Sequence, residues 1–106
     1  FERARAIAAG RGLAVDWQVV EDSAAVRCSS ELTEALAGAV AASGHTVVRL
    51  PSGAGHDAVK LAAITSVAML FVRCAGGVSH NPAESVTVGD VAAAIDATTR
   101  FLELVG

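Results

Sequence analysis

The 106-residue sequence has few of the side chains that usually fill a protein core. It has no tyrosine, one tryptophan and three phenylalanines, although 53% of its residues are hydrophobic. That apolar fraction argues against intrinsic disorder, and the length suits one small domain. Most of the apolar residues are alanine and valine, which bury less area than aromatic residues do. We therefore expect an ordered chain with a thin core.

Clustered positive charge and long apolar runs are also missing. The formal net charge is -3 and there is no run of Lys or Arg, which argues against nucleic acid and against a polybasic membrane patch. The longest apolar stretch, Val67 to Val72, is far too short to span a bilayer. No basic segment followed by an apolar one opens the chain, so secretion has no support. We expect no nucleic-acid partner, no membrane association and a cytoplasmic location.

The two cysteines, Cys28 and Cys74, are far apart, and neither has a CxxC or zinc-binding spacing around it. We interpret them as buried free thiols in a reducing compartment. The first residues read as the middle of a helix, without an initiating Met or a cap. We therefore expect that the chain begins inside a larger protein.

The N-terminal part of the sequence predicts a helix followed by a strand. Residues 1–9 are helix-like and end near Gly10 and Gly12, as a C-cap would. Residues 14–20 alternate well enough to form a strand. The polar residues 21–23 then break the pattern, which indicates a domain boundary.

A second helix is predicted from Ser29 and Ser30 to Gly44. Glu31 and Glu34 fall in or near its first turn, where the helix dipole favours negative charge. Its apolar face repeats at helical spacing, through Leu32, Ala35, Leu36, Ala39 and Val40.

The remaining sequence predicts the order strand, helix, strand, helix. The strands are residues 46–50 and 67–72, and the first of the two helices covers 57–64. The last helix begins at a capping-box pattern, Thr87 to Asp90, with Asp in place of Glu. Its apolar stripe is expected to be core: Val91, Ile95, Thr98, Leu102 and Val105. A strand–helix–strand crossover of this length is typical of a parallel sheet, so we expect the α/β class.

The loops 51–56 and 74–86 both follow the carboxyl ends of the predicted parallel strands. They should therefore lie at the same edge of the sheet, where open α/β sheets bind ligands. These loops hold His56 and His80, two of the three histidines. This is the strongest physical indication of a site.

His80 lies among turn-forming residues, with Glu84 close enough to accept a hydrogen bond from its ring. Such a partner fixes the imidazole tautomer and leaves the other ring nitrogen for a cation. The competing interpretation is a polar surface histidine.

The loop from Ser52 to Ala58 allows three interpretations. Its glycines let the backbone approach a ligand, and the helix start after His56 favours an anion or a carbonyl oxygen. A structural turn with Asp57 as the N-cap explains the pattern equally well. Gly53, Gly55 and Ala58 also fit a dinucleotide-binding pattern, but no acidic residue follows at the required distance. A serine nucleophile has no Gly-x-Ser-x-Gly elbow here.

Three segments together resemble the C-terminal part of the allantoate amidohydrolase and N-carbamoyl-L-amino-acid hydrolase family, which has a di-metal aminopeptidase-like fold. These are Ser52-Gly-Ala-Gly-His-Asp-Ala58, Met69-Leu-Phe-Val-Arg-Cys74 and Gly76-Gly-Val-Ser-His-Asn-Pro-Ala-Glu84. The resemblance implies that residues 1–21 end a lid or dimerisation domain. Residues 22–106 would form the C-terminal part of a three-layer α/β/α catalytic domain.

The resemblance also implies roles for individual residues. His80 is the expected ligand of one of two divalent metal ions, which would be manganese or zinc, with cobalt also suitable. Gly53, Gly55 and His56 are expected to contact the substrate, with Asp57 and Glu84 as supporting residues. No catalytic base is expected in this chain, because the family places it in an earlier segment.

The implied reaction is hydrolysis of a linear ureido C–N bond by two-metal activation of water. The substrate would be allantoate or an N-carbamoyl amino acid, and ammonia and CO2 would be released. The lid implies a homodimer for the full-length enzyme, and this chain alone is expected to be inactive. The alternative is a non-enzymatic ligand-binding or assembly domain of the same ancestry.

Overall fold

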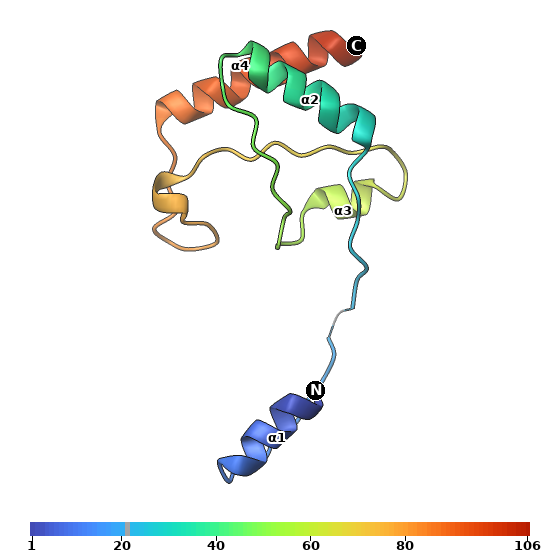
Figure 1. Cartoon of the computed structure of the whole chain (residues 1–106), viewed down its shortest axis with the longest axis vertical. Coiled ribbons are helices and arrows are strands. Elements are labelled where there is room, and N and C mark those ends of the chain that lie inside the picture. Colours follow the sequence, from blue (N-terminus) through green and yellow to red (C-terminus); the bar gives the residue numbers. More distant parts are fainter. Residues whose placement is uncertain (21) are drawn as a thin grey trace.

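The computed structural model describes residues 1–20 and 22–106. Within them lie α1 (Glu2–Gly10), α2 (Ser30–Ala42), α3 (Asp57–Leu61), the 3-10 turn η1 (Ala75–Gly77) and α4 (Val88–Val105). The radius of gyration is 19.1 Å, whereas a compact domain of this length has about 13 Å. Figure 1 shows the reason, because α1 stands apart from the other helices.

The four predicted helices are present, although the one predicted over 57–64 ends at Leu61. The starts of α2 and α4 follow the predicted capping signals. The Ser29 hydroxyl accepts a hydrogen bond from the Leu32 N–H at 3.3 Å and so caps α2. At the start of α4 the Thr87 hydroxyl accepts from the Asp90 N–H at 3.1 Å. The same hydroxyl donates to the Asp90 carboxylate at 2.6 Å. The predicted capping box therefore forms, with the Thr87 hydroxyl in place of its backbone N–H as the donor to Asp90.

The core lies where α2 packs against α4, with the segment 67–72 running beneath the two helices (Figure 1). Leu36 and Ala39 of α2, Ala97 of α4 and Val67 are its buried apolar residues. Ala39 and Ala97 are 0% and 3% exposed, so small side chains let the two helices approach closely. The Ser29 N–H donates to the Val67 carbonyl at 2.8 Å and joins the start of α2 to the segment beneath it. The expectation of a thin core is confirmed.

The predicted strands 14–20, 46–50 and 67–72 are neither helical nor paired in a β-ladder in the described part of the chain. A strand needs a neighbour that exchanges backbone hydrogen bonds with it along its length. Here the segments make other contacts instead. Arg49 forms a bidentate ion pair with Glu34 of α2, both contacts at 2.7 Å. The prediction of strands is therefore wrong for this structure.

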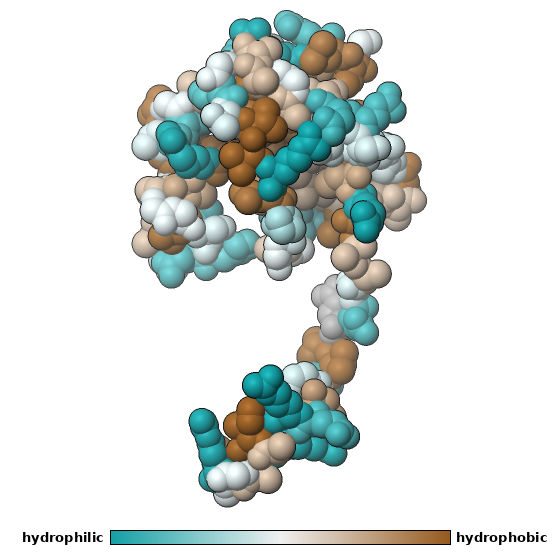
Figure 2. All heavy atoms as spheres, in the orientation of Figure 1, coloured by the Kyte–Doolittle hydropathy of each residue, from teal (hydrophilic) through white to brown (hydrophobic). Residues whose placement is uncertain are grey.

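The predicted apolar stripe of α4 is not buried. Ile95 is 61% and Leu102 59% exposed, because the face that contacts α2 runs through Ala97 instead. Figure 2 shows hydrophobic residues at the surface of the helical part and on the segment leading to α1. The expectation that this stripe is core is wrong here, because no second element covers it among the described residues.

The predicted boundary between residues 1–21 and 22–106 falls on residue 21, which lies outside the described residues. Before this boundary, within residues 1–20, α1 has no buried residue. Its local contacts are aromatic: Phe1 meets Trp17 edge to face at 5.5 Å, and Arg5 lies 4.3 Å over the Phe1 ring. No helix within residues 1–20 and 22–106 is long and apolar enough to cross a membrane.

Candidate active-site cleft

The two predicted loops line one cleft of about 1000 Å³. Residues 51–58 form part of its wall, and residues from the 69–86 segment form the rest. Both loops lie on the side of the molecule away from α2 and α4 (Figure 1). His56 and His80 therefore share a cleft although they are 24 residues apart in the sequence. We call this feature the two-loop cleft.

The first loop is held together by one serine hydroxyl. Ser52 Oγ lies 2.9 Å from the Ala54 carbonyl oxygen, 3.3 Å from the Ala54 nitrogen and 2.9 Å from His56 Nε2. The His56 ring also meets Phe71 at 6.5 Å with the ring planes at 80°. The imidazole is thus positioned both by its own loop and by the 67–72 segment.

The loop glycines leave open space in front of the backbone. A side chain added at Gly53 or Gly55 would meet no atom within 4 Å. Gly53 lines the cleft, whereas Gly55 does not. The predicted room for close backbone approach therefore exists at Gly53 on the cleft side.

Asp57 is the first residue of α3, and His56 is the N-cap. The alternative interpretation, in which Asp57 caps the helix, is therefore wrong. The Asp57 side chain instead lines the two-loop cleft within the first helical turn, where the helix dipole favours its negative charge.

His80 has an unusual backbone conformation that Glu84 stabilises. It is the one non-glycine residue with positive φ among those described, at 55°. Glu84 Oε2 accepts a hydrogen bond from the His80 N–H at 2.8 Å. The turn is closed by the Glu84 N–H, which donates to the Asn81 carbonyl at 2.8 Å. In this structure the Glu84 carboxylate binds the His80 backbone N–H, and its expected bond to the His80 ring stays a prediction.

Cys74 joins this arrangement, and the sequence interpretation missed it. Its thiol lies 3.6 Å from Glu84 Oε1 and lines the cleft. Partial burial raises the pKa of the thiol, and the carboxylates of Glu84 and Asp90 raise it further. Both cysteines are free, as predicted, but Cys28 is exposed and Cys74 half-buried. The position of Cys74 directly after the 67–72 segment was the available signal.

The described residues hold no group of three or more His, Cys, Asp or Glu side chains arranged to bind a metal ion. His80 contributes one imidazole to the cleft, and no described residue forms a hydrogen bond to its ring. A metal centre that uses His80 would need further ligands from outside this set of residues.

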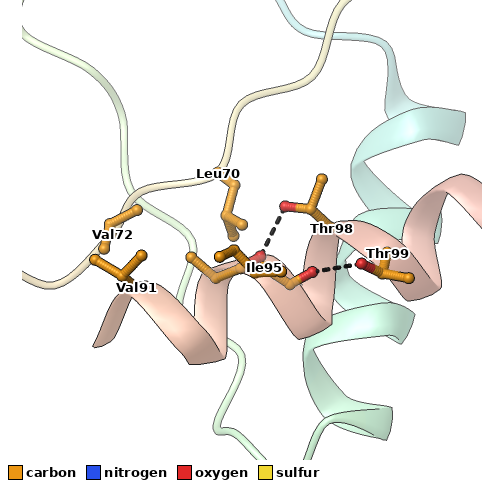
Figure 3. A pocket seen from close by; sticks show the side chains of 7 residues that line it. Leu70, Val72, Val91, Ile95, Thr98 and Thr99 are labelled. Carbon is orange, nitrogen blue, oxygen red and sulfur yellow. Dashed lines mark hydrogen bonds between the residues drawn. The ribbon is translucent and has the colours of Figure 1, made fainter. Parts of the chain in front are cut away.

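A second hollow, of about 360 Å³, is a weaker candidate (Figure 3). It lies between the 67–72 segment and α4, next to Leu70, Val72, Val91 and Ile95. The hydroxyls of Thr98 and Thr99 donate to helix carbonyls at 2.7 and 2.9 Å, so their protons are already used. The hollow thus has no charged side chain and no free donor to orient a substrate.

The chain belongs to peptidase family M20/M25/M40, whose sequence model matches residues 5–104. Among its relatives is a probable allantoate deiminase of Oryza sativa subsp. japonica. It is 48% identical over 93 residues, which cover 76% of this chain and 19% of the relative. An allantoate deiminase of Arabidopsis thaliana is 61% identical over 54 residues, covering 51% and 10% of the two chains.

A bacterial relative is the N-carbamoyl-L-amino acid amidohydrolase of Geobacillus stearothermophilus. It is 41% identical over 90 residues, covering 85% of this chain and 22% of the relative. The chain thus spans about a fifth of the length of these relatives. No solved structure matches the chain significantly.

These matches confirm the family resemblance that the sequence motifs indicated. Membership of the family supports the predicted α/β class. The lid, the three-layer arrangement and the roles of individual residues stay predictions.

Proposed function

We propose that this chain is part of the catalytic domain of a metal-dependent amidohydrolase that hydrolyses linear ureido C–N bonds. Allantoate or an N-carbamoyl amino acid would be the substrate. One water is consumed, and the ureido group leaves as ammonia and CO2 while the amine stays on the substrate. The names of the relatives support this substrate class.

The observation that carries the proposal is the convergence of the two family motifs on one cleft. His56 and His80 come from different loops and both line it. A cleft with a few convergent polar groups is the expected form of a small-molecule site. The second hollow lacks such groups.

His80 is the residue of this chain that suits a divalent metal ion. Imidazole binds manganese, zinc and cobalt, and Glu84 holds the backbone of the turn that carries the ring. When bound, two metal ions would supply an activated water and polarise the substrate carbonyl. The remaining ligands and the general base would come from parts of the enzyme outside this chain, so we expect the chain alone to be inactive.

The first loop would bind the substrate. Gly53 leaves its backbone open to the cleft, and His56 offers a ring nitrogen. Asp57 and Glu84 would act as supporting residues, Glu84 through the backbone of His80. We further propose a cytoplasmic homodimer, because both cysteines are free thiols and the family's lid domain is a dimerisation domain.

The test uses the longer protein that contains this chain, purified with manganese. Ammonia release is measured from allantoate and from N-carbamoyl amino acids. His80→Ala is expected to lower kcat/KM at least about 100-fold and to reduce the bound metal. His45→Ala is the matched control, because His45 lies outside the cleft in the connection after α2. Equal activity in the two variants would refute the proposed role of His80.

A further inference from the structure

The Ser52 hydroxyl has one hydrogen but several polar groups within hydrogen-bond distance. It has one hydrogen to donate and two lone pairs to accept. Three polar groups lie within hydrogen-bond distance: the Ala54 carbonyl oxygen at 2.9 Å, the Ala54 nitrogen at 3.3 Å and His56 Nε2 at 2.9 Å. The protonation of His56 follows from how these groups share that single hydrogen.

The Ala54 N–H can only donate to Ser52, and the Ala54 carbonyl can only accept. A carbonyl oxygen at 2.9 Å without a proton in between would face the lone pairs of Ser52 Oγ. The Ser52 hydroxyl therefore donates its hydrogen to the Ala54 carbonyl oxygen. His56 can satisfy its own contact by carrying the proton on Nε2 and donating it to Ser52. This arrangement satisfies all three contacts, whereas the reverse one leaves the Ala54 carbonyl opposed by a lone pair.

A neutral imidazole with its proton on Nε2 has a lone pair on Nδ1. No described residue forms a hydrogen bond to that atom, and His56 is one of the residues that line the two-loop cleft. The edge contact with Phe71 restricts the ring plane as well. His56 thus has an acceptor, and no free donor, left for a ligand.

We propose that Ser52 is a positioning residue that makes His56 a hydrogen-bond acceptor for the terminal amide N–H of a carbamoyl group. This inference rests on the proposed function, which it deepens by naming the part of the substrate that His56 recognises. A ureido substrate ends in –CO–NH2, which donates to Nδ1. An N-acetyl analogue has a methyl group in the same place and cannot donate.

The first measurement is the tautomer of His56 in the longer protein that contains this chain. Ring 15N shifts of labelled histidine distinguish Nε2–H from Nδ1–H. The His56 signals are assigned by their loss in His56→Asn. The native protein is expected to show the Nε2–H form alone, Ser52→Ala a mixture of tautomers, and Ser52→Thr the native pattern. Nδ1–H in the native protein, or no change in Ser52→Ala, would overturn the proposal.

The second measurement is discrimination between N-carbamoyl and N-acetyl forms of one amino acid. The ratio of their kcat/KM values is expected to fall about 3- to 10-fold in Ser52→Ala, the size of one neutral hydrogen bond. Inhibition constants replace kcat/KM for a compound that is not hydrolysed. Ser52→Thr should retain the ratio, and Ser66→Ala, an exposed serine outside the cleft, should leave it unchanged.

A double-mutant comparison separates positioning from general damage to the loop. If Ser52 acts through His56, Ser52→Ala has no further effect on the ratio in a His56→Ala background. Fully additive effects would overturn the proposal. If the protein hydrolyses no ureido compound at all, the proposed function fails, while the 15N spectra still decide the relationship between Ser52 and His56.

Discussion

Glu84 holds His80 by its backbone: the carboxylate accepts the His80 N–H at 2.8 Å in a turn where His80 has a φ of 55°. A non-glycine residue rarely adopts this conformation, which costs about 1 kcal/mol or more. The surrounding hydrogen bonds must therefore maintain it. Residues with backbone strain of this kind cluster at active sites and ligand-binding sites.

Replacing Glu84 should loosen that turn without removing a metal ligand. We expect Glu84→Ala to lower the metal affinity of the longer protein about 10-fold, because the His80 N–H loses its acceptor. Glu84→Gln keeps an amide oxygen and should retain most of the affinity. Metal content after dialysis against a chelator measures the effect. Glu103→Ala, which changes an exposed residue of α4, is the control. If Glu103→Ala lost as much metal as Glu84→Ala, the prediction would be contradicted.

The Arg49–Glu34 pair predicts a pH-dependent contribution to stability. The Arg49 guanidinium donates to the Glu34 carboxylate and lowers its pKa from the usual 4.5. A carboxyl whose folded pKa is lowered stabilises the fold above its unfolded pKa, and this contribution is lost as the pH falls through the folded value. Glu34→Gln should therefore lower the Tm at pH 7 and have little effect well below pH 4.5.

The size of that effect should be small and should depend on salt. Both side chains are more than half exposed, at 58% and 64%, so solvent screens the pair. Thermal unfolding at pH 7 in low and high salt measures it. Glu31→Gln is the control, because it removes a charge from the same helix but breaks no ion pair among the described residues. If the difference in Tm between Glu34→Gln and the native protein did not change with pH, this interpretation would be ruled out.

Removal of the cap of α4 should destabilise the protein. Thr87→Ala removes the hydroxyl that accepts the Asp90 N–H and donates to its carboxylate. We expect the free energy of unfolding to fall by about 1 kcal/mol, as for other N-caps. Thr87→Ser keeps the hydroxyl and should restore most of this loss. Urea denaturation followed by circular dichroism compares the three proteins, and equal midpoints would show that the cap does not contribute.

The close contact between α2 and α4 should not tolerate larger side chains. Ala97 is 3% exposed where α4 meets α2, so Ala97→Leu forces the helices apart. Overpacking of this kind usually costs about 1–3 kcal/mol. Ala92→Leu, on an exposed position of the same helix, should change stability by less than about 0.5 kcal/mol. Similar unfolding midpoints for the two variants would mean that Ala97 is not in the core.

The sequence motifs by themselves point to the candidate site. The order of predicted elements placed the loops of His56 and His80 at one edge, and the structure has them in one cleft. Helix starts were equally predictable, because Ser29 and Thr87 act through bonds to residues three positions away. The family followed from motif spacing, and the match over residues 5–104 confirms it.

Other features depended on contacts that local sequence does not encode. The four-residue separation of His80 and Glu84 would allow the carboxylate to bind either the ring or the backbone N–H of His80. Only the three-dimensional turn shows that it binds the backbone N–H. Ser52 looked like an ordinary loop serine until its three contacts were known. Its effect on His56 therefore needed atomic positions.

The sequence by itself determined which segments are helical and which two loops line one cleft, because these follow from caps, periodicity and motif spacing over a few residues. Tertiary structure alone decided which faces are buried. The 67–72 segment is apolar throughout, yet Phe71 is 47% exposed while Val67 is buried. Strand pairing and burial are properties of what lies next to a segment, and a neighbour distant in sequence leaves no mark on the segment's own pattern.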